Sequence, residues 1–148
     1  MKIRFLVAGE PRGKGRPRFS THAGRVMAFT PPETLAYERL IQAEFKCQCG
    51  GKRFGDSTQL DMRVIAYYSI PESAPKWKKA EMSKGIIRPT KTPDWDNIGK
   101  VVSDSLNGIA YKDDKQIVDA QIRKFYSNQP RIEVTILAAK MREEHNHV

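Results

Sequence analysis

The chain has 148 residues and carries 26 Lys and Arg against 17 Asp and Glu, which gives a net charge of +9 and an isoelectric point near 9.7. This length suits a single domain with its own core, and no segment approaches the ~20 apolar residues that are needed to cross a bilayer. A protein this small and basic usually binds a polyanion, most often nucleic acid, although such a charge can also serve only solubility.

The N-terminal part of the chain is expected to form a strand followed by a basic arm. Residues 1–8 alternate, with Ile3, Phe5 and Val7 on one face, which predicts a strand. Residues 9–31 are rich in Gly, Pro and Arg and predict an arm or an open hairpin. Because Met1 leads directly into a strand-like segment without a signal peptide, we expect a cytoplasmic protein.

A helix is predicted after the two prolines at 31 and 32, ending by the glycines at 50 and 51. Its side chains expected to face the core are Leu35, Leu40, Ile41 and Phe45. Cys47 and Cys49 near its end are expected to be free thiols in a reducing compartment. The alternative is a zinc site in which His145 and His147 supply two further ligands, but the spacing resembles no standard zinc module.

The rest of the chain predicts a strand, two helices and two final strands. Residues 60–70 alternate as a strand, and Pro75 opens a short basic helix that Gly85 ends. A helix is expected over 96–107, stopped by Gly108. Its inward residues are Ile98, Val101, Val102 and Leu106. A strand over 116–126, with Val118, Ala120 and Ile122 on one face, is expected to form a hairpin with the last strand through the turn residues 127–130.

This order of elements predicts one α+β domain spanning residues 1–148, in which helices pack on one face of a small mixed β-sheet. The arm at 9–31 lies outside that core, and residues 140–148 are expected to be a frayed tail.

Aspartates gather between Thr92 and Asp119, although the chain as a whole is basic. They are Asp94, Asp96, Asp104, Asp113, Asp114 and Asp119. Such a local inversion of charge costs stability unless cations neutralise it. Hard divalent cations such as Mg²⁺ take oxygen ligands of this kind. The segment is therefore a candidate metal site.

The spacing of these residues sharpens that hypothesis. Asp94 precedes the predicted helix and Asp96 suits its N-cap, while Asp96, Lys100 and Asp104 line one stripe at i, i+4 and i+8. Asp114 comes just before a strand that can return beside the helix N-terminus, so that Asp94, Asp96 and Asp114 can converge with Lys100 beside them. Taken singly, each residue also fits an ordinary cap, turn or helix pair; together, in a basic chain, they favour a metal site.

The segment PDWDNIGKVVSDSLNGIAYKDDKQIVD resembles the signature of the RusA family of Holliday junction resolvases. In that signature, D-x-D-N-x-x-K is followed by two aspartates and a glutamine before a strand. The opening GEPRGKGRPRF is similar to the basic start of phage-type members. The resemblance implies a RusA-like fold and a homodimeric, Mg²⁺-dependent nuclease of bacterial or phage origin that cuts four-way DNA junctions symmetrically, in recombination and repair.

The resemblance also implies roles for individual residues. Asp94, Asp96 and Asp114 correspond to the metal-binding carboxylates, and Lys100 to the essential lysine. Asn97, Asp104 and Asp113 are implied as supporting residues. Phosphodiester hydrolysis fits this set, because a metal ion activates water and stabilises charge on the phosphate. Mg²⁺ is the expected cofactor, with Mn²⁺ as a substitute.

The arm is expected to hold the DNA backbone, through Arg12, Lys14, Arg16, Arg18 and Arg25. Phe19 and Phe29 are candidates for apolar wedges at an opened junction, with ordinary packing as the alternative.

Two other functions remain open on the sequence. Pro93-Asp94 with Asp113-Asp114-Lys115 matches the PD…D-x-K pattern of restriction-type nucleases, in which Lys115 would replace Lys100. That fold normally carries its carboxylates on strands or a hairpin, whereas a helix is predicted between them here. The second alternative is a non-catalytic DNA-binding module, for which no helix-turn-helix or zinc-finger pattern is found.

Overall fold

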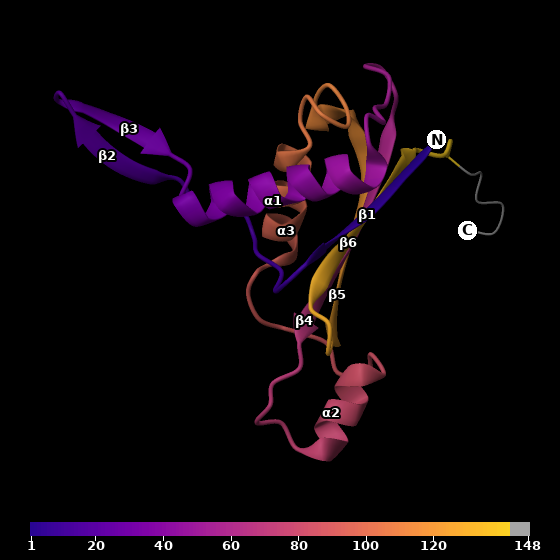
Figure 1. The fold of residues 1–148 in the computed structure, drawn as a ribbon. Helices are drawn as coiled ribbons and strands as arrows, with labels where there is room; N and C mark the ends of the chain where they lie inside the picture. The colour runs from indigo at the N-terminus through magenta and orange to yellow at the C-terminus, as the bar shows by residue number, and fades with distance from the viewer. Residues whose placement is uncertain (143–148) are drawn as a thin grey trace.

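A four-stranded mixed sheet forms the centre of the computed structural model, which describes residues 1–142 (Figure 1). The strands are β1 (Lys2–Ala8), β4 (Leu60–Ser69), β5 (Ile117–Ser127) and β6 (Arg131–Ala138), in the order β1-β6-β4-β5. β4 and β5 are parallel, and the other neighbouring pairs are antiparallel. The predicted mixed sheet is confirmed.

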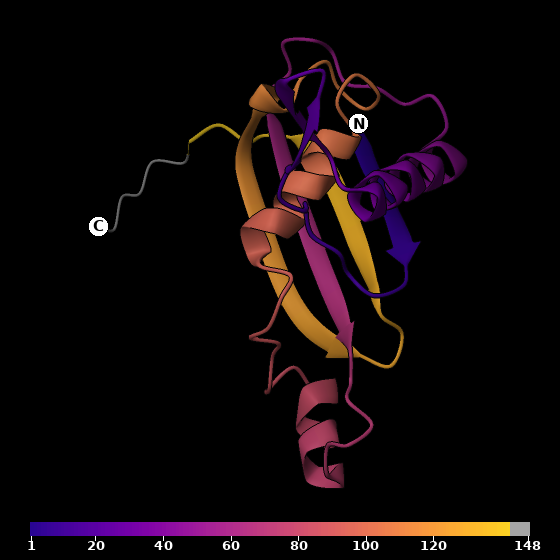
Figure 2. The same ribbon diagram turned by 90° about the vertical axis from the view of Figure 1, so that its left-hand side faces the viewer.

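Two helices, α1 (Pro32–Cys49) and α3 (Trp95–Ser105), cover the same face of this sheet (Figure 2). The core lies between them and the sheet, where alternate residues of β1, β4 and β6 are buried. These are Ile3, Phe5 and Val7 on β1, Met62, Val64, Ala66 and Tyr68 on β4, and Ile132, Val134 and Ile136 on β6. The prediction of an α+β domain with helices on one face is therefore confirmed.

The buried stripe of α1 differs in part from the prediction. Ile41 and Phe45 are buried as expected, but Leu35 and Leu40 are 38% and 42% exposed. Tyr37 takes an inward position, because the sequence Tyr37, Ile41, Phe45 follows the i, i+4, i+8 row that faces the sheet. Leu35 and Leu40 lie beside that row. Because both are apolar, the sequence alone could not show that they would not face the core.

The predicted hairpin between the last two strands is wrong. Ser127 and Arg131 are joined by the expected turn, but β4 lies between β5 and β6 and pairs with both. A link of this length can cross one strand, because neighbouring strands are only about 4.8 Å apart. β4 occupies the centre because its core-facing residues from Leu60 to Tyr68 are buried. β5 is left as an edge strand on which Val118 is exposed at an irregularity in register.

The segment predicted as an arm or open hairpin forms a hairpin of β2 (Arg18–His22) and β3 (Arg25–Phe29) that extends away from the sheet (Figure 1). The turn between them uses Ala23 and Gly24, both with positive φ, as two-residue hairpin turns require. Every residue of both strands is exposed. We call residues 18–29 the hairpin arm.

The short basic helix is α2 (Lys76–Ser83), and Gly85 follows it with a φ of 77°. It lies beyond one end of the sheet (Figure 2). The segment after it returns to β5, where the Arg88 guanidinium lies 4.2 Å from the ring centroid of Phe125 and its Nε donates to the Lys124 carbonyl. No helix in the described part of the chain is long and apolar enough to cross a membrane.

The cysteines of the zinc alternative have different surroundings. Cys47 is exposed, whereas Cys49 is buried with its Sγ 3.4 Å from the Arg4 carbonyl oxygen. His145 and His147, and most of the tail predicted to be frayed, lie outside the described residues.

Candidate active site

Helix α3 presents two chemically different sides, and this places the candidate residues. Ile98, Val101 and Val102 are fully buried against the core, which fixes the helix on the sheet as predicted. Asp96 and Lys100 are exposed on the other side. The hydroxyl of buried Tyr68 donates to the Pro93 carbonyl at 2.6 Å and anchors the segment that enters the helix.

The start of α3 corrects one prediction. The N-cap is Asp94, not Asp96, and its side chain makes no capping hydrogen bond. Asp96 lies in the first turn, where a carboxylate interacts favourably with the helix dipole. Asp94 can therefore offer its carboxylate oxygens to another group.

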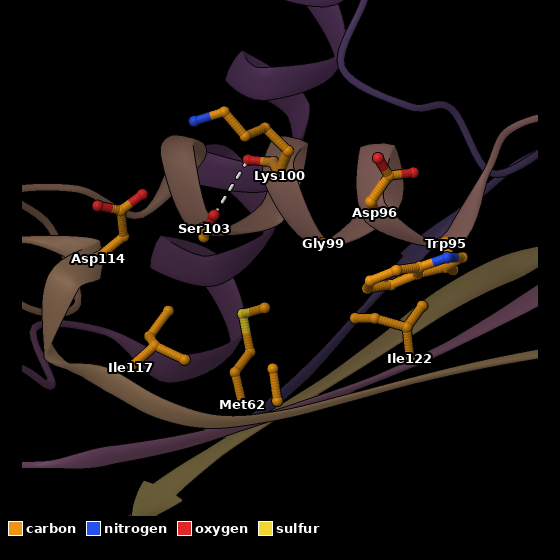
Figure 3. Close-up of a pocket in the computed structure, with 10 residues that line it drawn as sticks. Met62, Trp95, Asp96, Gly99, Lys100, Ser103, Asp114, Ile117 and Ile122 are labelled. Atoms are coloured by element: carbon orange, nitrogen blue, oxygen red, sulfur yellow. Dashed lines mark hydrogen bonds between the residues drawn. The ribbon is translucent and has the colours of Figure 1, made fainter.

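A hollow of about 300 Å³ opens between α3 and β5 (Figure 3). Its polar lining consists of Asp96, Lys100, Ser103 and Asp114. Asp114 reaches it from the turn before β5, and the other three come from α3. Three residues singled out in the sequence thus lie around one cavity, although Asp114 lies outside α3.

A 3-10 turn over Asp114–Gln116 positions Asp114. Asp113 caps this turn by accepting from the Lys115 amide at 2.9 Å, which holds the pKa of Asp113 below its usual range. Gln116 accepts from the amides of Lys112 and Asp113, and its Nε2 donates to the carbonyls of Gly55 and Thr58. Asp113 therefore supports Asp114 as part of the turn rather than facing the hollow itself.

Asp114 lies among other carboxylates. Burial raises its pKa, and the hydrogen bond with Asp113 and the negative charges of Asp104 and Asp113 raise it further. The positive charge of Lys100 opposes this effect. The Asn107 side chain accepts from the Asp114 amide at 2.8 Å and fixes the backbone there. The turn thus holds a carboxylate where a cation would relieve repulsion.

Asp104 joins the helix to the N-terminal segment. It lies 3.4 Å from the Lys100 ammonium and, through its other oxygen, 3.4 Å from that of Lys14. Lys14 also pairs with Glu38 on α1 at 2.5 Å. Burial lowers the pKa of Lys14, but its hydrogen bonds to Glu38 and Asp104 and their charges raise it overall. The predicted pairing of Lys100 and Asp104 along α3 is present, and Lys14 from the N-terminal segment also contacts Asp104.

This network revises the expectation for the basic arm. Lys14 bridges α1 and α3, and Arg18 pairs with Glu33, so both have carboxylate partners within the chain. Arg12, Arg16 and Arg25 are exposed. Lys14 is better placed to support Asp104 than to contact DNA.

Asn97 is where the N-terminal segment contacts α3. The Lys14 amide donates to the Asn97 carbonyl at 2.9 Å. A Cβ on Gly13 would lie 2.8 Å from the Cβ of Asn97, closer than real contacts allow, so only glycine permits this approach. Phe19 and Phe29, for which packing was the alternative, are 70% and 42% exposed on the hairpin arm.

The carboxylates do not form a ready-made metal cage. Within residues 1–142, no three His, Cys, Asp or Glu side chains lie close enough to hold one metal ion. Asp94 is near Lys124 and Tyr68, whose pKa values it influences, and does not line the hollow. Asp96 and Asp114 lie on either side of Lys100 (Figure 3). The expected convergence of Asp94, Asp96 and Asp114 is therefore not found within one chain.

The donor set nevertheless fits a hydrated divalent cation. Asp96 and Asp114 offer hard carboxylate oxygens on the same hollow. Mg²⁺ commonly keeps several waters and is bound by one or two carboxylates together with substrate phosphates. The arrangement suits an ion completed by water and DNA.

Sequence reasoning missed three residues around the hollow. Trp95 lines it and is 65% exposed. Gln116 and Asn107 hold the Asp114 turn. The glutamine was visible in the motif, but only the fold reveals its partners at 55 and 58. Lys115, required by the restriction-type alternative, does not line the hollow, and α3 separates the two acidic parts of that pattern.

Comparison with known proteins agrees with this geometry. The profile of a family described as "Endodeoxyribonuclease RusA" matches residues 8–137. The chain is also 38% identical over 136 residues to "Uncharacterized protein YqaN" of Bacillus subtilis (strain 168), an alignment that covers 90% of this chain and 94% of that protein. Members of the matched family are generally dependent on a divalent metal. The matched range includes α1, α3, the Asp114 turn, β4, β5 and all of β6 except its last residue, and the chain belongs to the RusA family of endodeoxyribonucleases.

Proposed function

We propose that this protein is a Mg²⁺-dependent, structure-selective endodeoxyribonuclease that resolves four-way DNA junctions by symmetric cleavage, in recombination and repair. The observation that carries the proposal is the hollow on which Asp96, Lys100 and Asp114 meet, in a basic chain of the RusA family. Family membership supports junction cleavage, and the hollow supplies the residue types that phosphodiester hydrolysis requires.

Asp96 and Asp114 would hold the divalent ion, with Asp94 contributing from the N-terminus of α3. When bound, the ion supplies an activated water and neutralises charge on the phosphate. Mn²⁺ has similar ligand preferences and is an expected substitute. The carboxylates repel DNA on their own, so binding and cleavage are separable functions of the chain.

Lys100 would contact the scissile phosphate. Its ammonium is exposed beside the hollow and is restrained by Asp104, 3.4 Å away. A charge positioned in advance stabilises the negative charge that grows in the transition state. Asp104 and Lys14 act through Lys100 and are positioning residues in this scheme.

Exposed arginines of the N-terminal region would bind the DNA backbone, while the hollow performs the chemistry. We also propose a homodimer, because symmetric cutting of a two-fold junction needs two sites related by a two-fold axis. Sedimentation at micromolar concentration tests this; a species of only one chain mass, 16.9 kDa, would contradict it.

The proposed activity is tested on four-way, three-way and linear DNA of matched sequence, with Mg²⁺ or with EDTA. We expect paired symmetric nicks in the four-way junction with Mg²⁺ and none with EDTA. Asp96→Asn is the inactive control, and Asp119→Asn is its matched partner because Asp119 lies outside the hollow. Junction binding without nicking at any concentration of divalent ion would instead favour the alternative of a non-catalytic DNA-binding module.

A further inference from the structure

The floor of the hollow is apolar, in contrast to its charged rim. Met62, Ile117 and Ile122 lie beneath Asp96, Lys100 and Asp114 (Figure 3), and Ala120 also lines the hollow. Hydrolysis of a phosphodiester uses the charged rim, but it gives no reason for an open apolar floor. A cavity that combines an apolar body with few polar groups is typical of a site for an organic ligand.

Trp95 forms one wall of this cavity. Its indole lies over Ile122 and is 65% exposed, so one side of the ring rests on the sheet while the other remains accessible (Figure 3). Trp95, Gly99 and Ser103 follow one another at i, i+4 and i+8 along α3, facing β5. The two small residues leave space beside the large one.

Gly99 shows how closely the helix approaches the floor. A Cβ at this position would lie 3.3 Å from the Cδ1 of Ile122. A larger side chain here would fill the cavity or displace α3 from β5. The absence of a side chain at Gly99 therefore keeps the hollow open beneath Lys100.

We propose that the hollow binds one nucleobase of the DNA strand being cut, taken out of the base stack and placed against Trp95. This inference rests on the proposed function, because the strand must bring its phosphate to Lys100. A nucleobase has apolar faces that suit Trp95 and the floor, and polar edges that suit the rim. Every base has such a face, so stacking on an aromatic side chain needs no particular sequence.

The site would explain a preference for branched DNA. Removing a base from an intact duplex requires unpairing and unstacking, and this cost is least where the base is already unpaired or distorted. At the centre of a four-way junction, where strands exchange between helices, pairing and stacking are weaker than along a linear duplex. Structure selectivity would then arise beside the scissile phosphate, in addition to contacts made by the hairpin arm.

The first test follows the base directly. Trp77→Phe leaves Trp95 as the one tryptophan, since Trp77 on α2 does not line the hollow. Asp96→Asn keeps the DNA intact. We expect junction DNA to quench Trp95 fluorescence in this double variant, and 2-aminopurine next to the mapped cleavage position to change in fluorescence on binding. Unchanged signals from both probes, with the junction bound, would overturn the proposal.

The second test uses cleavage by otherwise intact enzyme. We expect Trp95→Ala to lower the preference for four-way over linear DNA by about 5- to 100-fold, and Trp95→Phe to retain most of it. An abasic nucleotide beside the cut should impair wild-type cleavage but add little to the Trp95→Ala defect. If Trp95→Ala folds poorly, Ala120→Leu serves in its place. It fills the floor without changing the charged rim, and we expect it to cause the same loss of preference.

These outcomes separate the base site from the nuclease function. Wild-type enzyme that cuts junctions with Mg²⁺ while Trp95→Ala, Ala120→Leu and the abasic junction all behave normally would reject the base site alone. Wild-type enzyme that cuts no DNA would reject the proposed function, whatever the fluorescence shows.

Discussion

The hairpin arm and the turn that carries Asp114 are both connecting segments, yet they are held in opposite ways. All ten residues of β2 and β3 are exposed, and the arm is shaped mainly by its own turn and strand pairing. The Asp114 turn is tied to three other places, through Asn107, Gly55 and Thr58. A segment that positions a reacting group needs such anchoring, whereas one that follows a flexible polyanion does not.

The largest expected effect is on cleavage, and it comes from the carboxylates at the start of α3 and on the Asp114 turn. Asp96→Asn, Asp114→Asn and Asp94→Asn should each reduce cleavage below detection while junction binding stays equal or becomes tighter. Each change removes a metal ligand and also removes repulsion of phosphate. Single-turnover cleavage and gel-shift titration measure the two effects. An active triple variant would contradict the site, and Asp119→Asn controls for the loss of a charge.

The next effect concerns Lys100. Lys100→Ala should slow single-turnover cleavage by about 10²–10³-fold with little change in affinity or melting temperature, as when one preorganised donor is removed. Lys100→Arg should restore little, because the guanidinium differs in shape and reach. Lys115→Ala is the matched control outside the hollow. If it proved the more damaging change, the restriction-type mechanism would be preferred.

The free energy of unfolding should also distinguish the exposed arm from the packed core. Phe45→Ala should cost about 3–5 kcal/mol of unfolding free energy, because Phe45 is buried and packs edge-on against Phe5. Phe19→Ala on the exposed arm should change it by no more than about 0.5 kcal/mol. Denaturant unfolding gives both values. An equal loss in the two variants would mean that the arm packs against something in solution.

The smallest effect is on the salt dependence of DNA binding. Arg16→Ala and Arg25→Ala should each reduce the log–log salt slope by about 0.9 if each contacts one phosphate. Lys14→Ala should leave the slope unchanged, because its ammonium already pairs with Glu38 and Asp104. Titration at several salt concentrations distinguishes these variants. A reduced slope for Lys14→Ala would show that its carboxylate partners release it on binding.

The sequence predicted what depends on local pattern and neighbouring residues. Alternation identified β1, β4 and β6, and the apolar row of Ile98, Val101 and Val102 oriented α3 correctly. Strand order could not be predicted, because the turn residues at 127–130 suit a hairpin and a crossing over β4 equally well.

The candidate site was predictable only as a set of residues. The motif named Asp96, Lys100 and Asp114, and the fold places all three on one hollow. The partners of Lys14, the anchors of Gln116 and the apolar floor depend on contacts between distant parts of the chain, which periodicity does not report. The expected convergence of three carboxylates is not found within residues 1–142, where Asp96 and Asp114 line the hollow and Asp94 does not.

The attachment of Lys14 and Gly15 to the helices limits the length of DNA that one chain would cover in the proposed complex. Lys14 and Gly15 are fixed to Asn97 and Thr34, so the chain leaves the helices at a set point beside the site. Strands of five residues extend about 17 Å beyond it. Since consecutive base pairs are about 3.4 Å apart, the tip can reach only about five base pairs further along an arm of the junction. In the proposed complex the arm therefore limits how much DNA is protected, and chemical footprinting should find the edge of protection there.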